Sequence, residues 1–307
     1  MTVVGDYAAK TDTGKKRRRN EDAFVLAPPL FAVADGMGGA QAGEIASKLA
    51  AAALEDTDPG RLTGPERVAS LIQEANRRVH ERSSVDPATS GMGTTMTVAL
   101  VEDDGVVIGH VGDSRAYLVR GHEIEQITED HSLVNELLKS GKLSAEEAET
   151  HPQRSVITRA VGTDPDVDVD SFTVHTQDGD VFLICSDGLT DMVDDELILE
   201  TVERHRTNLE RMTKQLVSAA NRGGGEDNIT VVAFSIGARD GDDIGDTATM
   251  QAVTLPVVDD DTREDVGVRA SNEAVLAGPS AVRVRVVLAT LIVLALLVSL
   301  LLWGLMR

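Results

Sequence analysis

The sequence predicts an α/β (α+β) protein in which antiparallel sheets carry helices on their outer faces. Strand-like stretches are joined by short turn segments such as Asp103-Asp104-Gly105, and such turns favour hairpins over long crossovers. Stretches with helical spacing follow groups of strands instead of alternating with single strands. This order argues against a doubly wound parallel sheet.

The first half of the chain predicts an edge strand, a pair of strands and two helices. Residues 3–14 have the pattern of an edge strand, and residues 24–35 form two strands interrupted by Pro28-Pro29. An alanine-rich stretch at 43–54 has helical composition. Residues 66–81 place apolar side chains at helical spacing, which predicts a second helix.

The second half of the chain predicts further strands, a charged helical segment and two final helices. The Asp-Gly turn at 177–180 predicts a hairpin between strands at 172–176 and 181–185. The other expected elements are strands at 94–101 and within 106–121, a helical segment at 131–150, helices at 195–205 and 209–221, and a strand at 229–237.

Composition and charge exclude some classes of function. The 307-residue chain carries a formal net charge of −22 and would repel nucleic acid, so no nucleic-acid partner is expected. Aromatic residues make up only 3%, so the core must be aliphatic. The lone cysteine, Cys185, excludes an internal disulfide, fits a reducing compartment and is expected to be a small buried hydrophobe.

The C-terminal region predicts a tether and a membrane anchor. Residues 238–282 are rich in Asp, Gly, Thr and Ala and predict an acidic disordered linker. No residue from Val286 to Met306 is charged, and these residues, at 1.5 Å each, span about 32 Å, the hydrocarbon thickness of a bilayer. A single transmembrane helix is therefore predicted at 283–306.

The charges beside this run predict its orientation. Arg283 and Arg285 precede the run and only Arg307 follows it, which favours a cytoplasmic location for everything N-terminal to the helix. The N-terminus has no apolar stretch of signal-peptide length. The predicted location is the cell membrane, single-pass, with the N-terminal domain in the cytoplasm.

Four aspartates stand where an apolar strand meets a turn. If the strands share one core, these strand ends could converge, and buried like charges need a neutralising partner. Divalent cations with oxygen ligands supply one, and no His or Cys has zinc-site spacing, so Mg²⁺ or Mn²⁺ is favoured. The residues alone also allow four ordinary turn aspartates. The four are Asp35 after FAVA, Asp113 after VVIGHVG, Asp187 after VFLICS and Asp227 before ITVVAF.

Eight motifs follow one another along the chain: RRRNED, FAVADGMGG, GMGTT, GHVGDSRAYL, DHS, HPQRSVITRAVG, CSDGLTD and GEDNITVV. Their order and spacing resemble those of the bacterial metal-dependent protein phosphatases of the protein phosphatase 2C family. The resemblance covers about residues 3–236 and predicts a phosphatase domain at 1–237. It implies a four-layer α-β-β-α sandwich of two antiparallel sheets flanked by helices. The overall layout is similar to the membrane-anchored actinobacterial phosphatases that oppose Ser/Thr kinases.

The resemblance implies a set of metal ligands for two or three Mn²⁺ or Mg²⁺ ions. Asp35 would bridge two ions, and the Gly36 backbone carbonyl would ligate one of them. Asp187 and Asp227 would hold the other ion. Asp113, together with Asp187, would contribute to the third metal site seen in bacterial members.

Three further residues match positions near the substrate. Arg17 matches the arginine that grips the substrate phosphate, and Glu21 and Asp22 would lie near the ions through water. The implied reaction is hydrolysis of phosphoserine and phosphothreonine in proteins by metal-activated water, without a phosphoenzyme. The expected catalytic residues are Arg17, Asp35, Asp187 and Asp227.

One position departs from the animal members of the family. They carry a His after the first Asp-Gly, proposed as the general acid, whereas this chain has Met37, as is common in bacterial members. A metal-bound water, His131 and His151 are the alternatives for the leaving-group acid, although each His is expected to order the flap or cap a helix. Residues 132–163 match a mobile flap that affects substrate choice and metal affinity.

The expected partners are phosphorylated proteins, in particular Ser/Thr kinases and their substrates. Two alternatives remain at this point. One is a catalytically weak, membrane-tethered phosphoprotein-binding module, although every metal-ligand position of the family is filled. The other is a phosphatase dedicated to one anti-sigma antagonist, which would use the same chemistry on a narrower range of substrates.

Overall fold

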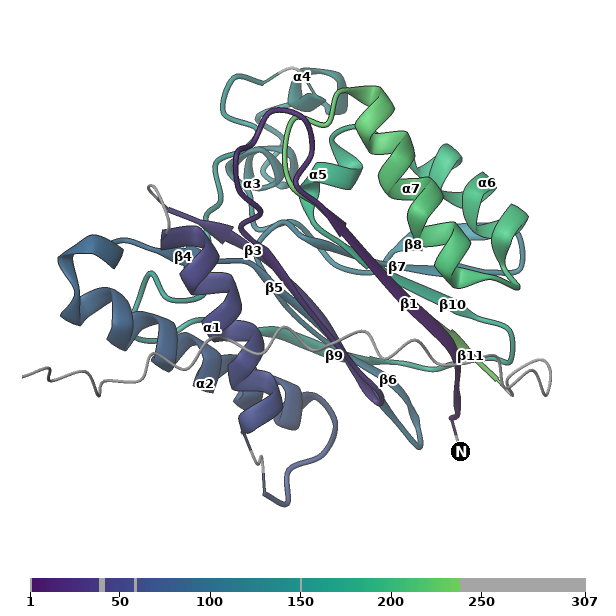
Figure 1. Ribbon diagram of the computed structural model, residues 1–307, viewed down its shortest axis with the longest axis horizontal. Helices are drawn as coiled ribbons and strands as arrows, with labels where there is room; N and C mark the ends of the chain where they lie inside the picture. The colour runs from purple at the N-terminus through teal and green to yellow at the C-terminus, as the bar shows by residue number, and fades with distance from the viewer. Residues whose placement is uncertain (1, 39–41, 58–59, 150, 238–307) are drawn as a thin grey trace, which may run out of the picture. The chain divides into compact units, whose positions relative to one another are not determined.

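Two antiparallel sheets lie face to face in the computed structural model (Figure 1). The structure describes residues 2–38, 42–57, 60–149 and 151–237. Sheet A consists, from edge to edge, of β1 (Val4–Asp12), β11 (Ile229–Ile236), β10 (Val181–Cys185), β7 (Arg115–Arg120) and β8 (Glu123–Gln126). Sheet B consists of β2 (Asp22–Ala27), β3 (Leu30–Met37), β5 (Met96–Glu102), β6 (Gly105–Val111) and β9 (Asp170–Val174), with the short β4 (Gly93–Thr94) paired to β3.

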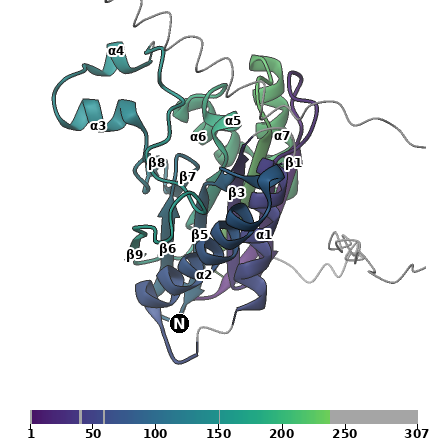
Figure 2. The same ribbon diagram turned by 90° about the vertical axis from the view of Figure 1, so that its left-hand side faces the viewer.

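Helices cover the outer face of each sheet, and two short helices stand apart. Figure 2 shows these two short helices projecting beyond the sheets. Sheet B carries α1 (Ala42–Asp56) and α2 (Gly64–Val85), and a 3₁₀ turn, η1 (Pro87–Thr89), follows α2. Sheet A carries α5 (Asp187–Thr190), α6 (Asp195–His205) and α7 (Leu209–Gly223). The helices that stand apart are α3 (Leu133–Lys139) and α4 (Ala145–Glu149). The predicted arrangement, two antiparallel sheets with flanking helices, is confirmed.

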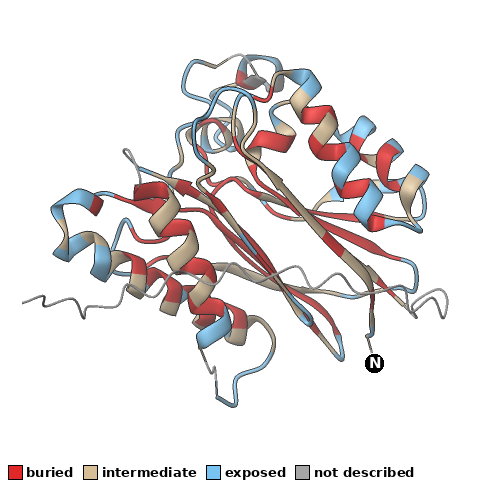
Figure 3. Ribbon diagram, viewed as in Figure 1, coloured by how far each residue is buried: buried red, intermediate tan, exposed pale blue. Residues whose placement is uncertain are grey.

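Three apolar clusters fill the spaces between these layers, and Figure 3 shows their buried residues in red. One cluster fills the space between sheet B and its helices, and another lies between sheet A and its helices. The third lies between the sheets, where Phe234 of β11 stacks on Phe31 of β3 with ring centroids 4.3 Å apart. Phe182 of β10 also stacks on the Phe234 ring, with ring centroids 5.1 Å apart. The few aromatic residues are therefore concentrated where the two sheets meet.

The predicted hairpin between residues 172–176 and 181–185 is wrong. β9 pairs with β6 in sheet B, whereas β10 pairs with β7 and β11 in sheet A, so the Asp-Gly turn carries the chain from one sheet to the other. Every residue of β10 is buried and takes a central place, while β9 is half-buried and lies at an edge. The turn sets the reversal, but burial on both faces selects the partner strand.

Two local expectations also change. The strand that was expected to end at Asp35 is β3, and it continues to Met37. Gly36 and Met37 pair with Thr94 and Gly93 of β4, which extends β3 past the carboxylate. The helical segment expected at 131–150 is split into α3 and α4, because Gly141 adopts φ +68°, a left-handed conformation that ends a helix.

The predicted linker at 238–282 and the predicted transmembrane helix at 283–306 lie outside the described residues. Within the residues that the structure describes, no helix is both long enough and apolar enough to cross a membrane. The domain boundary at 237 and the two C-terminal segments therefore stay predictions.

The stacked phenylalanines between the sheets yield a stability prediction. Phe234→Ala should lower the free energy of unfolding by about 3–5 kcal/mol, because it removes a fully buried ring and leaves a cavity between both sheets. Urea unfolding followed by circular dichroism measures the change. Phe24→Ala, at a ring that is 38% exposed on the edge strand β2, is the matched control and should cost about 1 kcal/mol or less. Equal losses for the two variants would contradict this account.

Candidate active site

Five carboxylates from both sheets converge at one end of the sandwich. Asp22 and Asp35 are directly opposite each other on β2 and β3 of sheet B. Asp187 is the first residue of α5, immediately after β10 of sheet A, and Asp227 precedes β11. Asp113 lies in the connection from β6 to β7. The predicted convergence of Asp35 with the other three predicted aspartates is therefore present, and the pairing of β2 with β3 adds Asp22.

Burial and mutual repulsion raise the pKa values of these carboxyl groups. Burial is the largest cause of the raised pKa of Asp35, and the negative charges of Asp22, Asp187, Asp113 and Asp227 add to it. The pKa of Asp187 is also well above its usual value, because of burial and then the charge of Asp113. Burial raises the pKa values of Asp22 and Asp113 to about 6. The site therefore favours either protons or cations among its oxygens.

Asp35 is held by the backbone and hydroxyl groups of the GMGTT motif. Its N–H donates to Thr95 Oγ1 at 2.9 Å, and its carbonyl accepts from Thr94 Oγ1 at 2.8 Å and from the Thr95 N–H at 2.9 Å. Thr94 is the last residue of the short strand β4, which pairs with β3, and Thr95 directly follows it. Asp35 therefore has little freedom to move away from its neighbours, and its carboxyl stays at the centre of the cluster.

Asp22 is oriented by hydroxyl groups from the other sheet. Thr230 Oγ1 donates to Asp22 Oδ2 at 2.6 Å, and Ser186 Oγ donates to the same oxygen at 2.9 Å. Thr230 belongs to β11 and Ser186 precedes α5, so these two hydrogen bonds connect sheet A to sheet B. The other carboxyl oxygen of Asp22, Oδ1, is buried and has no hydrogen-bond partner among the described residues.

Two glycines allow α1 to pack closely against β3 beside Glu21. A Cβ on Gly43, in the first turn of α1, would lie 2.7 Å from the Gly36 carbonyl oxygen and 2.9 Å from Glu21 Oε2. A Cβ on Gly36 would lie 2.1 Å from the Gly43 carbonyl oxygen. Any side chain at either position would therefore displace the helix from the strand and shift the Gly36 carbonyl and the Glu21 carboxylate.

Arg17 and Asn228 connect the N-terminal loop to the cluster. Arg17 Nη2 donates to Asp227 Oδ2 at 2.5 Å, and the Arg17 side chain is half exposed. Asn228 accepts from the Glu21 N–H at 2.7 Å and donates to the carbonyls of Thr13 and Arg19. This asparagine holds the loop that carries Arg17 in place, and sequence reasoning missed it. Its place in GEDN, directly after Asp227 and before a buried strand, was the available signal.

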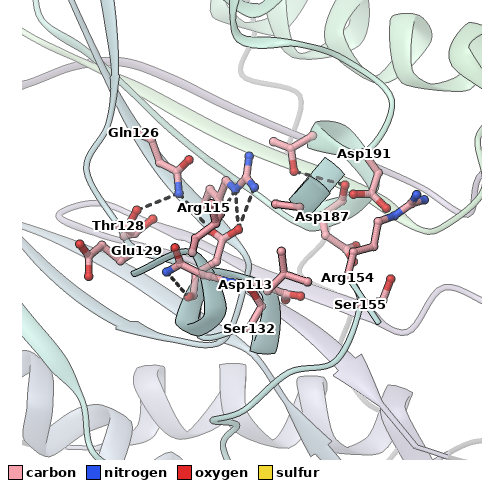
Figure 4. Close-up of a pocket in the computed structure, with 16 residues that line it drawn as sticks. Asp113, Arg115, Gln126, Thr128, Glu129, Ser132, Arg154, Ser155, Asp187 and Asp191 are labelled. Atoms are coloured by element: carbon pink, nitrogen blue, oxygen red, sulfur yellow. Dashed lines mark hydrogen bonds and ion pairs between the residues drawn. The ribbon is translucent and has the colours of Figure 1, made fainter. Parts of the chain in front are cut away.

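A cleft of about 660 Å³ opens beside Asp113 and Asp187 (Figure 4). α3 and the segment that contains Arg154 form one wall, and a bidentate ion pair between Arg115 and Asp130 forms part of the floor. Asp191 also lines the cleft. It lies four residues after Asp187 in CSDGLTD, a helical spacing that could have indicated a shared face.

The hydrogen bonds of His131 and His151, the two histidines considered for the leaving-group acid, are made with groups outside the five carboxylates. The Met37 side chain faces Gly93, whose Cβ would meet the Met37 methyl group at 2.8 Å. Both ring nitrogens of His131 have partners, because Nδ1 accepts from the Gly112 N–H and Nε2 lies 3.1 Å from Asp170. His151 Nδ1 accepts from the Gln153 N–H within its own turn. Each histidine therefore orders the local backbone, as expected.

The oxygens of the cluster fit divalent cations. Among the described residues, the buried Oδ1 atoms of Asp22, Asp113 and Asp187 have no hydrogen-bond partner. Asp35 lies among these groups, and the negative charges of Asp22 and Asp187 add to burial in raising its pKa. No group of three or more potential ligands within the described ranges already has the spacing of a formed metal site. Cations would relieve the repulsion among these carboxylates, and hard oxygen ligands of this kind suit Mg²⁺ or Mn²⁺.

Comparison with known proteins agrees with this site. Residues 15–223 match the family model described as protein phosphatase 2C. The serine/threonine phosphatase Stp of Listeria monocytogenes is 42% identical over 234 residues, which cover 73% of this chain and 92% of that protein. The crystal structure of the serine/threonine phosphatase PstP of Mycobacterium tuberculosis is similar, with a TM-score of 0.71 and 39% identity over 76% of this chain and 99% of that one.

A second similar structure contains metal ions. It is the catalytic domain of PstP in complex with two manganese ions, with a TM-score of 0.68 and 37% identity over 76% of this chain and 98% of that chain. The fold and the carboxylate cluster define a metal-dependent phosphatase, and the chain belongs to the protein phosphatase 2C family. Within this family it is a protein serine/threonine phosphatase, which removes phosphate from phosphoserine and phosphothreonine in proteins.

The raised pKa values predict how stability depends on pH in the absence of cations. Burial raises the pKa of Asp22 to about 6 in the folded protein, whereas the pKa of an unfolded aspartate is near 3.8. The stabilisation is fully present below the unfolded pKa and is lost as the pH rises through the folded pKa. With chelator present, the cluster's contribution to the free energy of unfolding should therefore fall between about pH 4 and pH 6 and above.

Asp35→Asn tests this assignment. The variant cannot ionise at the centre of the cluster, so with chelator at pH 7.5 it should be more stable than the parent and lose less stability between pH 5 and pH 7.5. Urea unfolding at the two pH values measures the difference. Glu123→Gln, at an exposed carboxylate of β8, is the control and should follow the parent. A parallel loss in Asp35→Asn and the parent would show that repulsion at this site is not the cause.

Proposed function

We propose that this phosphatase works with two or three Mn²⁺ or Mg²⁺ ions held by Asp35, the Gly36 carbonyl, Asp187, Asp227 and Asp113. The observation that carries the proposal is the set of buried carboxylate oxygens that lack a partner in the described structure. When bound, such ions neutralise the phosphate and activate water for attack on phosphorus, without a phosphoenzyme. Repulsion among the carboxylates is relieved by the same binding.

The protein's own residues would position the phosphate and the ligands. Arg17 is half exposed and now paired with Asp227, so its guanidinium can change partner from a carboxylate to a phosphate oxygen. Glu21 and Asp22 lie beside the ligands and would orient water around the ions. Asn228 holds the Arg17 loop at the edge of the site. These roles support hydrolysis of phosphoserine and phosphothreonine side chains that enter from solvent.

Metal dependence and Arg17 give a direct activity prediction. A phosphothreonine peptide should release phosphate with Mn²⁺ and not after chelation. Arg17→Ala should lower kcat/KM roughly 10- to 100-fold, because a charge-assisted hydrogen bond to phosphate is lost. Arg18→Ala changes an exposed neighbour with the same charge and should stay within about threefold. Phosphate release measured with malachite green decides both points.

Three outcomes would count against the proposal or against the role of Arg17. Turnover that survives chelation would exclude the metal mechanism. Manganese binding in calorimetry without any turnover would indicate a phosphoprotein-binding module instead. A comparable loss in Arg17→Ala and Arg18→Ala would show that the loop contributes only general positive charge, and the specific role of Arg17 would then be excluded.

We also propose that the enzyme is a single-pass membrane protein of the actinobacterial type, with a cytoplasmic catalytic domain that opposes membrane Ser/Thr kinases. The uncharged run from Val286 to Met306 supports a membrane helix at 283–306, and Arg283 and Arg285 before it support the orientation. A tether at 238–282 would let the domain reach phosphorylated kinases and their substrates close to the membrane.

Membrane fractionation tests the anchor. The full chain should stay in the membrane pellet after an alkaline carbonate wash, and removal of residues 283–307 should release it. Protease added outside intact cells should leave the catalytic domain uncut, because that domain is proposed to be cytoplasmic. Full release of the unmodified chain by carbonate would contradict the transmembrane assignment.

A further inference from the structure

Two hydrogen-bonded ends connect the flap to the rest of the protein. The Leu133 N–H donates to the Val156 carbonyl at 2.9 Å, and the Thr158 N–H donates to the His131 carbonyl at 2.8 Å. Between these ends, the chain forms α3 and α4, which project from the sheets in Figure 2. The segment is therefore closed at its base by a short antiparallel pairing, and its position depends on what holds that base.

Asp170 contacts both ends of the flap. It is the first residue of β9, the edge strand of sheet B. Its Oδ2 lies 3.1 Å from His131 Nε2, and its Oδ1 accepts from Arg159 Nη1 at 2.7 Å. Arg159 Nη1 also lies 3.0 Å from His131 Nε2, so the three side chains touch one another. One carboxylate on the edge strand β9 thus holds residues on both sides of the flap base.

His131 continues this connection to the active site. Its N–H donates to the Gly112 carbonyl at 2.7 Å, and its Nδ1 accepts from the Gly112 N–H at 3.0 Å. Because Nδ1 accepts, the ring proton lies on Nε2 and faces Asp170. Gly112 adopts φ +111° and directly precedes Asp113. The backbone N–H and carbonyl of Gly112, beside that carboxylate, are therefore both held by His131, one through the buried imidazole and the other through the backbone N–H.

We infer that Asp170 is a positioning residue that fixes the flap to the core and, through His131 and Gly112, sets the place of Asp113. The inference extends the proposed function, on which its catalytic consequence rests. Asp170 is 42% exposed, and an ion pair of this kind contributes little to global stability. Its loss should therefore loosen the flap base while the sheets stay folded.

Asp170→Asn tests the connection by amide hydrogen exchange of the full chain. The side-chain amide introduced at position 170 has one oxygen, so it can accept from only one of the two partners, His131 and Arg159, at full strength. Exchange at the Gly112 and Thr158 N–H groups should therefore accelerate about tenfold, as expected for loss of one charge-assisted hydrogen bond. Glu102→Gln is the matched control, because Glu102 also ends a pairing in sheet B and accepts from an arginine and a backbone N–H. It should accelerate exchange at Gly64 and leave Gly112 unchanged.

Kinetics and a conservative variant separate positioning from a general structural role. In Asp170→Asn, KM for a phosphothreonine peptide should rise about fivefold, while KM for p-nitrophenyl phosphate, which has no peptide flanks, stays within about twofold. Arg159→Met should resemble Asp170→Asn, and Arg159→Lys should restore most of the slow exchange at Gly112, since it keeps the positive charge.

Unchanged exchange at Gly112 in Asp170→Asn would overturn the inference. Exchange at Gly112 that accelerated equally in Glu102→Gln would overturn it as well. The exchange measurement needs no turnover. If the protein showed no phosphatase activity, the proposed function would fail while the connection from Asp170 to Gly112 was still decided by exchange.

Discussion

Repulsion among buried carboxylates is the constraint on which the rest of the structure depends. Asp35 stands opposite Asp22 on the neighbouring strand, and burial together with the charges of Asp22 and Asp187 raises its pKa, so three acidic groups repel one another away from water. Such a group of charges persists only where the surrounding fold holds it. Threonines from β4 and its neighbour, hydroxyls from sheet A and the close packing of α1 against β3 all serve this end.

The sequence predicts those parts of the site that depend on single strands. Asp35 and Asp187 each follow an uninterrupted apolar run, and such a run shows both the strand and the carboxylate that ends beside it. The antiparallel class also follows, because Asp-Gly turns and the absence of regular crossovers restrict how strands can pair. Family motifs add the expectation that Arg17 binds phosphate, which its charge alone could not distinguish from an exposed basic patch.

Features that arise from pairing between distant segments were not predictable in this way. The Asp22–Asp35 juxtaposition depends on the register of β2 with β3, and the role of Asn228 depends on a loop more than two hundred residues earlier in the chain. The turn at 177–180 has the signature of a hairpin, yet its two strands belong to different sheets, because partner choice follows burial. Local patterns report local geometry, whereas these contacts are set by packing of the whole domain.

The flap lies in the chain between β8 of sheet A and β9 of sheet B, and its two ends meet at a paired base. A segment whose ends are already joined adds little loop-closure entropy when it grows or shrinks. Insertions or deletions between residues 134 and 155 would leave the register of both sheets and the carboxylate cluster unchanged. The wall of the cleft can therefore diverge in length and sequence during evolution independently of the chemistry, which lets one catalytic centre acquire different sets of phosphoprotein substrates.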